Sequence, residues 1–230
     1  MLLTDGPFAE GAEVANGFYL LRAADRDEAT KIASMIPGSA VQLRRLRDGH
    51  ALAALVLLHD SRRATRVDGK GALLPLDEQD RARWDRGKIA RGLDRLRRAE
   101  GSTGPYLPQA VIAAVHATAA SWEHTDWATI CAAYDKLLRL TDSPVVRANR
   151  ALAIGFRDGP EAGLAALERA AHDPRLVRSN LVLTVRADLL RRAGRYGEAA
   201  QAYQEALVLN GSEPGRAFLR RRIGECAGQD

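Results

Sequence analysis

Cysteine, aromatic residues and long apolar stretches are all scarce in this chain of 230 residues. The two cysteines, Cys131 and Cys226, have no CxxC partner and lie in apolar helical patterns. This placement indicates reduced packing residues rather than a disulfide framework. No apolar run is long enough to span a bilayer, and no secretory signal pattern is present. We therefore expect a cytoplasmic protein that does not enter the membrane.

The patterns typical of common catalytic and metal sites are also missing. No serine lies in GxSxG, and no GxGxxG follows a predicted strand. The histidines show no HxxxH spacing and no paired cysteines accompany them: His50, His59, His116, His124 and His172. We therefore expect no metal, no cofactor and no catalytic residues.

Alanine, leucine and arginine dominate what is present, a mixture that suits packed helices better than sheets. The net charge is +5, but the positive excess is spread along arginine-rich segments and no tract is purely basic. We expect at most weak, sequence-independent affinity for DNA, arising from this salt-sensitive charge.

Residues 77–99 predict one long amphipathic helix, around which the first half of the chain is organised. Asp77 is a suitable N-cap. The apolar face comprises Ala82, Ile89, Leu93 and Leu96. We expect this helix to pack against a preceding one at 48–65, with a hairpin at 66–76 indicated by Asp68-Gly69.

A polar set close to this face is the first candidate site: Arg62, Arg63, Gln79, Asp80, Arg81, Trp84 and Asp85. Arginine forks there could hold the carboxylate or phosphate of a partner or ligand. The same residues could instead form a structural network within the fold. We expect Trp84 to be buried and Asp80 or Asp85 to pair with Arg62, Arg63 or Arg81.

Residues 1–47 differ in character from the rest and predict a small β-β-α-β unit. Strands are indicated at 17–22 and 40–46, and a helix at 25–35. The segments TDGPFAE, NGFYLLRAADRDEATKIASMIP and SAVQLRRL resemble the second half of a YCII-related (DGPF-type) domain. This resemblance implies a ferredoxin-like fragment without its middle strand, and an open sheet edge that favours a homodimer. YCII-type enzymes are thought to use a His–Asp pair. Asp5 resembles its Asp, and the half that carries the His has no counterpart here.

The second half of the chain is repetitive. Ala199, Tyr203 and Ala206 recur as Gly163, Leu167 and Ala170, and earlier as Ile130, Tyr134 and Leu137. The spacing lies near the tetratricopeptide period of about 34 residues. Helix pairs are therefore expected at 107–122 with 126–140, 144–156 with 160–171, and 180–193 with 195–209, closed by a helix at 213–224.

Helix stacking would turn a second set of polar and aromatic residues toward one groove: Gln109, His116, Asp126, Trp127, Asn149 and Arg150. Functionally these residues would form the concave binding surface of a repeat stack. As structure, Asp126 would cap a helix, Trp127 would lie in the core and Asn149 would bond exposed backbone.

A second resemblance spans residues 49–223. The segments LHDSRRATR, DEQDRARWD, GPYLPQAVIAAVHA, TDWATI, SPVVRANRALA and VRADLLRRAGRYGEAAQAYQEAL look like the C-terminal helical extension of one group of extracytoplasmic-function (ECF) RNA polymerase sigma factors. Nothing in the chain resembles the sigma regions that read the −10 and −35 promoter elements.

The expected architecture is mainly α: a partial α+β fragment at 1–47, then tetratricopeptide-like stacked helix pairs at 48–230. The resemblance implies a non-catalytic interaction or regulatory module in transcription initiation. Its partner would be RNA polymerase or a sigma-associated regulator, with no specific DNA binding. The alternative is a YCII-type enzyme with a helical appendage.

Overall fold

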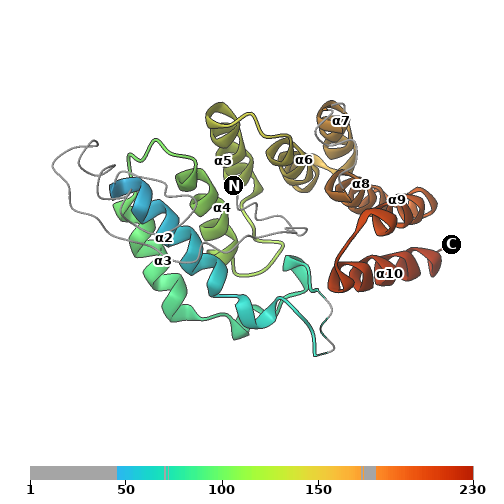
Figure 1. Cartoon of the computed structure of the whole chain (residues 1–230), viewed down its shortest axis with the longest axis horizontal. Coiled ribbons are helices and arrows are strands. Elements are labelled where there is room, and N and C mark those ends of the chain that lie inside the picture. The colour runs from blue at the N-terminus through green and yellow to red at the C-terminus, as the bar shows by residue number, and fades with distance from the viewer. Residues whose placement is uncertain (1–45, 70, 72, 172, 174–179, 230) are drawn as a thin grey trace, which may run out of the picture.

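The protein is mainly helical. A computed structural model describes residues 46–69, 71, 73–171, 173 and 180–229 (Figure 1). The helices are α2 (Leu46–Asp60), α3 (Arg86–Arg98), α4 (Tyr106–Thr118), α5 (Trp127–Leu140), α6 (Pro144–Asp158), α7 (Pro160–Ala171), α8 (Asn180–Arg192), α9 (Tyr196–Leu209) and α10 (Glu213–Ala227). Short 3-10 turns are η1 (Arg63–Thr65), η2 (Leu76–Glu78) and η3 (Arg81–Arg83). The expected fragment at 1–47, with Asp5 and the dimer edge, lies almost entirely outside the described residues.

The helices pack mainly on their neighbours in sequence. Helix α2 contacts α3 and α4, and contacts then run from α4 to α5, α6, α7, α8, α9 and α10 in turn. The array follows an arc, and residues 73–78 lie between its two ends (Figure 1). This order agrees with the expected succession of helix pairs from residue 106 onward.

The repeat pattern correctly identified core positions. All nine of its aligned residues are buried: Ile130, Tyr134, Leu137, Gly163, Leu167, Ala170, Ala199, Tyr203 and Ala206. The helix boundaries from α5 to α9 also agree within two residues, because local signals set them, whereas α4 ends at Thr118, before the predicted end at residue 122. Ser143 accepts a hydrogen bond from the Val146 amide and Pro144 follows at the first helical position, while Gly159 (φ 99°) ends α6. Both cysteines are buried, as expected for packing residues.

The prediction of one helix over residues 77–99 is wrong. The chain makes two 3-10 turns first, and α3 begins only at Arg86. Asp80 accepts a hydrogen bond from the Ala82 amide and Asp85 from the Lys88 amide, so each aspartate caps a separate turn. The Asp85 amide in turn donates to the Ser61 carbonyl over 2.8 Å. These local and long-range bonds outweigh the helical propensity of the arginine-rich run.

The hairpin predicted at 66–76 is present in minimal form. A single antiparallel bridge joins Val67 to Leu73, and the Leu74 amide donates to the Arg66 carbonyl over 2.9 Å. This bridge positions the following residues, 74–78, between two hydrophobic cores. Leu73 packs on the larger core of α4–α10, whereas Leu76 belongs to the smaller core of α2, α3 and α4.

Helices α6 and α7 cross at a pair of glycines. A Cβ atom on Gly163 would lie only 2.8 Å from the Cα of Gly155 and 3.0 Å from the Ala151 carbonyl oxygen. Backbone atoms cannot move aside as a flexible side chain can, so the two helices would have to separate.

We expect Gly163→Ala to lower the free energy of unfolding by about 1–3 kcal/mol, the usual cost of overpacking a core. Gly224→Ala is the matched control, because Gly224 is also helical but a Cβ there would meet nothing within 4 Å. Urea unfolding followed by circular dichroism measures both. An unchanged midpoint for Gly163→Ala would show that the crossing is not tight.

Candidate functional site

Three members of the first predicted set, Gln79, Arg81 and Trp84, lie in a structural cluster around Trp84. This side chain is 3% exposed, which confirms its expected burial. Its indole Nε1 donates to Thr65 Oγ1 over 3.0 Å, and the Arg81 guanidinium lies 4.7 Å from its ring centroid. Gln79 is also buried and donates to the Leu74 carbonyl over 2.9 Å. Trp84, Thr65 and Gln79 thus tie the 3-10 turns to the end of the hairpin.

Arg81 closes the C-terminal end of α4. Its Nη1 donates to the carbonyls of His116, over 2.6 Å, and Ala119, over 3.2 Å. The last carbonyls of a helix have no partner within the helix and carry partial negative charge, so a guanidinium is well placed there. Burial lowers the pKa of Arg81, with Glu123 acting in the opposite direction.

The expected ion pairs of Asp80 or Asp85 with these arginines are wrong. Both aspartates are exposed helix caps, and Asp85 forms its ion pair with Lys88, at 3.7 Å. The hydrogen bond that the Lys88 backbone amide donates to Asp85 is the main cause that lowers the pKa of Asp85. Arg62 Nη2 lies 3.2 Å from His59 Nδ1, and Arg63 is exposed. An Asp85 substitution therefore removes a cap and strands no buried arginine.

The second predicted set is divided by the structure. His116 and Trp127 meet with ring centroids 5.5 Å apart, within an aromatic cluster that also includes Trp122 and Phe156. Trp127 is partly buried and stacks on Phe156 at 4.3 Å. The guanidinium of Arg192 covers the Phe156 ring at 4.1 Å. Sequence reasoning missed Trp122, Phe156 and Arg192, which belong to three different segments.

The other four members of that set make their described contacts elsewhere. Gln109 bonds the Pro105 carbonyl in its own helix, and Asn149 is buried within α6. Asp126 caps α5 through the Thr129 amide, as the sequence predicted, and Arg150 pairs with Asp135 at 2.5 Å.

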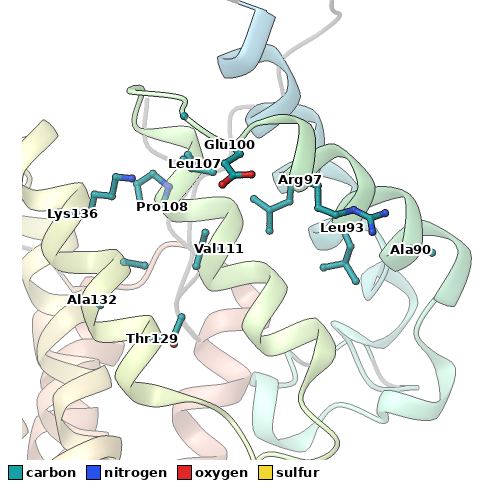
Figure 2. Close-up of a pocket in the computed structure, with 13 residues that line it drawn as sticks. Ala90, Leu93, Arg97, Glu100, Leu107, Pro108, Val111, Thr129, Ala132 and Lys136 are labelled. Atoms are coloured by element: carbon teal, nitrogen blue, oxygen red, sulfur yellow. The ribbon is translucent and has the colours of Figure 1, made fainter.

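An apolar groove lies between α3 and α5, with α4 as its floor (Figure 2). Its volume is about 910 Å³, and it is open to solvent. Leu93, Leu107, Pro108 and Val111 supply apolar surface, while Thr129, Ala132 and Ala133 of α5 form the opposite wall. Three charged side chains border it: Arg97, Glu100 and Lys136. None of these residues belongs to either predicted set.

The groove has the chemistry of a surface that binds the apolar face of a helix. Such grooves combine an apolar floor with a few polar groups at the edge that fix orientation. Arg97 and Lys136 are exposed and lie on opposite walls. An occupant carrying acidic residues on its flanks would complement them.

A second polar region lies where η2 faces the C-terminal helices. Asp77 pairs with Arg192 of α8 at 3.2 Å. Glu78 pairs with Arg221 and Arg222 of α10, at 2.7 Å each. These contacts join residues more than a hundred positions apart in the chain.

Next to this region, the Asp188 carboxylate forms ion pairs with two arginines of its own helix, α8. Asp188 is 5% exposed, and its carboxylate accepts from Arg191 over 2.9 Å and from Arg192 over 2.8 Å. Burial alone would raise the pKa of Asp188, but the charges and hydrogen bonds of Arg192 and Arg191 outweigh it and lower the pKa. Burial, with Asp188 nearby, raises the pKa of Tyr203.

Comparisons with known proteins identify relatives of undetermined role. Residues 6–100 match a family of unknown function, DUF6596. The chain is 36% identical over 228 residues to "Uncharacterized protein R00370" of Rhizobium meliloti (strain 1021). The alignment covers 96% of this chain and 52% of that protein, so the chain spans about half the length of this relative. No solved structure matches.

No helix among the described residues is long and apolar enough to cross a membrane.

Proposed function

We propose that the chain is a non-catalytic protein-interaction module related to the C-terminal extension of ECF sigma factors. It acts in transcription initiation by binding a protein of that machinery rather than promoter DNA. The observation that carries this proposal is the open apolar groove between α3 and α5.

The helical order supports a tetratricopeptide-like stack. Small residues stand where helices cross, as at Gly155 and Gly163, and Tyr203 lies in the core with 0% exposure. Stacks of this kind use extended surfaces to bind partners rather than to carry out chemistry.

The occupant we propose is an amphipathic helix of an RNA polymerase subunit or of a sigma factor. An apolar floor with flanking helices suits the apolar face of a third helix. Arg97 and Lys136 favour acidic residues beside that face.

The test is binding of purified RNA polymerase core enzyme, and of sigma-factor regions, to the immobilised full chain. Val111→Glu places a charge on the groove floor, where an apolar partner could not solvate it. We expect this variant to weaken binding by about tenfold or more, since burying an unpaired charge costs more than about 1.4 kcal/mol.

Val208→Glu is the matched control. Val208 lies on α9, is 81% exposed and is outside the groove. Melting temperatures of both variants show whether they fold. If neither polymerase nor sigma regions bind, the proposed function is wrong. If both variants bind as the wild type does, the groove is not the binding surface.

A further inference from the structure

The basic region on α8 and α10 is occupied by a short acidic segment of the chain itself. Residues 74–78 follow the hairpin bridge and place Asp77 and Glu78 against three arginines, Arg192, Arg221 and Arg222. The segment lies between the two ends of the helical arc (Figure 1). It shares no residue with the groove of Figure 2.

The arginines also make contacts with residues outside the acidic segment, which contribute to their position. Arg192 is fixed by Asp188 and by the Phe156 ring. Arg222 is 6% exposed, pairs with Glu225 at 2.7 Å and lies 5.2 Å from the Phe218 ring centroid. Arg221 also reaches Glu225, at 3.3 Å. These three arginines are therefore held partly by contacts that do not involve the acidic segment.

The arginines of this cluster outnumber the carboxylates that α8 and α10 place beside them by two. Arg191, Arg192, Arg221 and Arg222 face only two carboxylates of α8 and α10, those of Asp188 and Glu225. Asp77 and Glu78 supply the two missing negative charges. In addition, Arg221 Nη2 and Arg222 Nε are buried without a hydrogen-bond acceptor. The arginine cluster therefore has hydrogen-bond donors that remain unused while Asp77 and Glu78 are in place.

The internal segment is held by partly buried ion pairs. The side chains of Asp77 and Glu78 are 23% and 27% exposed, and that of Arg221 is 37% exposed. The pairs of Asp77 with Arg192 and of Glu78 with Arg221 are partly open to solvent, where ion pairs are individually weak. The pair of Glu78 with Arg222 is the more buried one. Leu76, by contrast, is buried in the smaller core and anchors the segment nearby.

We propose that the arginine face formed by Arg192, Arg221 and Arg222 is a docking site for an acidic peptide with two adjacent carboxylates, and that Asp77 and Glu78 occupy it as an internal competitor. A partner segment carrying a similar acidic pair displaces these carboxylates from α8 and α10. This site is additional to the groove and does not rest on the proposed role in transcription.

The probe is a fluorescent peptide that copies residues 73–79 (LLPLDEQ), with LLPLNQQ as its uncharged counterpart. Fluorescence anisotropy measures binding to the full chain. Asp77→Ala/Glu78→Ala removes the internal competitor. We expect this variant to bind the acidic peptide on the order of tenfold more tightly than the wild type, because the site is no longer partly occupied. Binding should weaken as salt is raised.

Further experiments distinguish a docking site from ion pairs that only stabilise the fold. The acidic peptide should raise the melting temperature of the double variant, whereas a structural tie predicts a lower melting temperature with no response to peptide. Adding Arg221→Ala should abolish peptide binding, while Arg220→Ala should not, since Arg220 pairs with the exposed Glu213 instead. Glu78→Ala alone provides a milder variant if the double one does not fold.

Equal affinity of wild type and variants, or equal binding of LLPLDEQ and LLPLNQQ, would overturn the proposal. The assay contains no polymerase or sigma factor, so its result is independent of the groove experiment.

Discussion

Asp188→Ala is expected to lower the free energy of unfolding by about 3–5 kcal/mol, because it leaves two arginines without their buried counter-charge. Asp188 is 5% exposed and bonds both Arg191 and Arg192. The substitution also disturbs Arg192, which links α8 to Asp77 and to the Phe156 ring. Urea unfolding followed by circular dichroism would measure the loss.

Asp94→Ala is the control for this change. Asp94 also pairs with two arginines of its own helix, Arg97 and Arg98, but its side chain is 40% exposed. Exposed pairs contribute little, so we expect a loss below about 1 kcal/mol. Similar losses for the two variants would mean that burial does not set the strength of the Asp188 interactions.

The Asp188 contribution should also depend on pH. The pKa of Asp188 is lowered in the folded protein, so the unfolded chain takes up a proton first as the pH falls. The contribution is fully present above the unfolded pKa of about 3.9 and is lost as the pH falls through the folded value. The stability difference between wild type and Asp188→Asn should therefore be smaller at about pH 3 than at about pH 7. A constant difference would argue against an ionised Asp188.

Helix boundaries in the second half could be predicted because their signals are local. Ser143 with Pro144, and Gly159 with Pro160, mark ends that the structure reproduces. The repeat spacing then identified buried positions such as Tyr203, because each repeat makes its contacts with near neighbours in the chain.

The first half was harder to predict because long-range contacts decide its conformation. A helix through residues 77–99 satisfies local propensity, but the bond from the Asp85 amide to the Ser61 carbonyl favours separate turns. The apolar groove was missed for a related reason. Leu93, Val111 and Ala132 come from three helices and carry no polar signature, so only their packing reveals a common surface. No local sequence pattern predicts the Asp77–Arg192 pair either.

Trp84 joins the 3-10 turns to the smaller core, so its truncation should have the other large effect. Its side chain belongs to the smaller core, together with Leu55 and Leu58 of α2 and Ile89 of α3. Trp84→Ala should lower the free energy of unfolding by about 3–5 kcal/mol, since a buried tryptophan leaves a cavity that neighbours fill only partly. The Arg81 guanidinium would also lose the ring that it covers.

Trp84→Phe separates packing from hydrogen bonding. It keeps an aromatic ring in the core but removes the Nε1 donor to Thr65 Oγ1. Thr65 still donates to the Arg62 carbonyl over 2.9 Å, so its hydroxyl keeps a partner. Apart from the cost of the smaller side chain, we expect this variant to lose only about 1 kcal/mol of the free energy of unfolding, the net value of one hydrogen bond.

Combining Trp84→Phe with Thr65→Val in a double-mutant cycle measures that bond directly. The loop from Thr65 to Trp84 contains both the hairpin and the acidic segment, and these two side chains close it. If Trp84→Ala unfolds in urea at the wild-type midpoint, the ring does not hold the turns in place. The position of Asp77 and Glu78 opposite α8 and α10 would then depend on the bridge between Val67 and Leu73 and on the packing of Leu76.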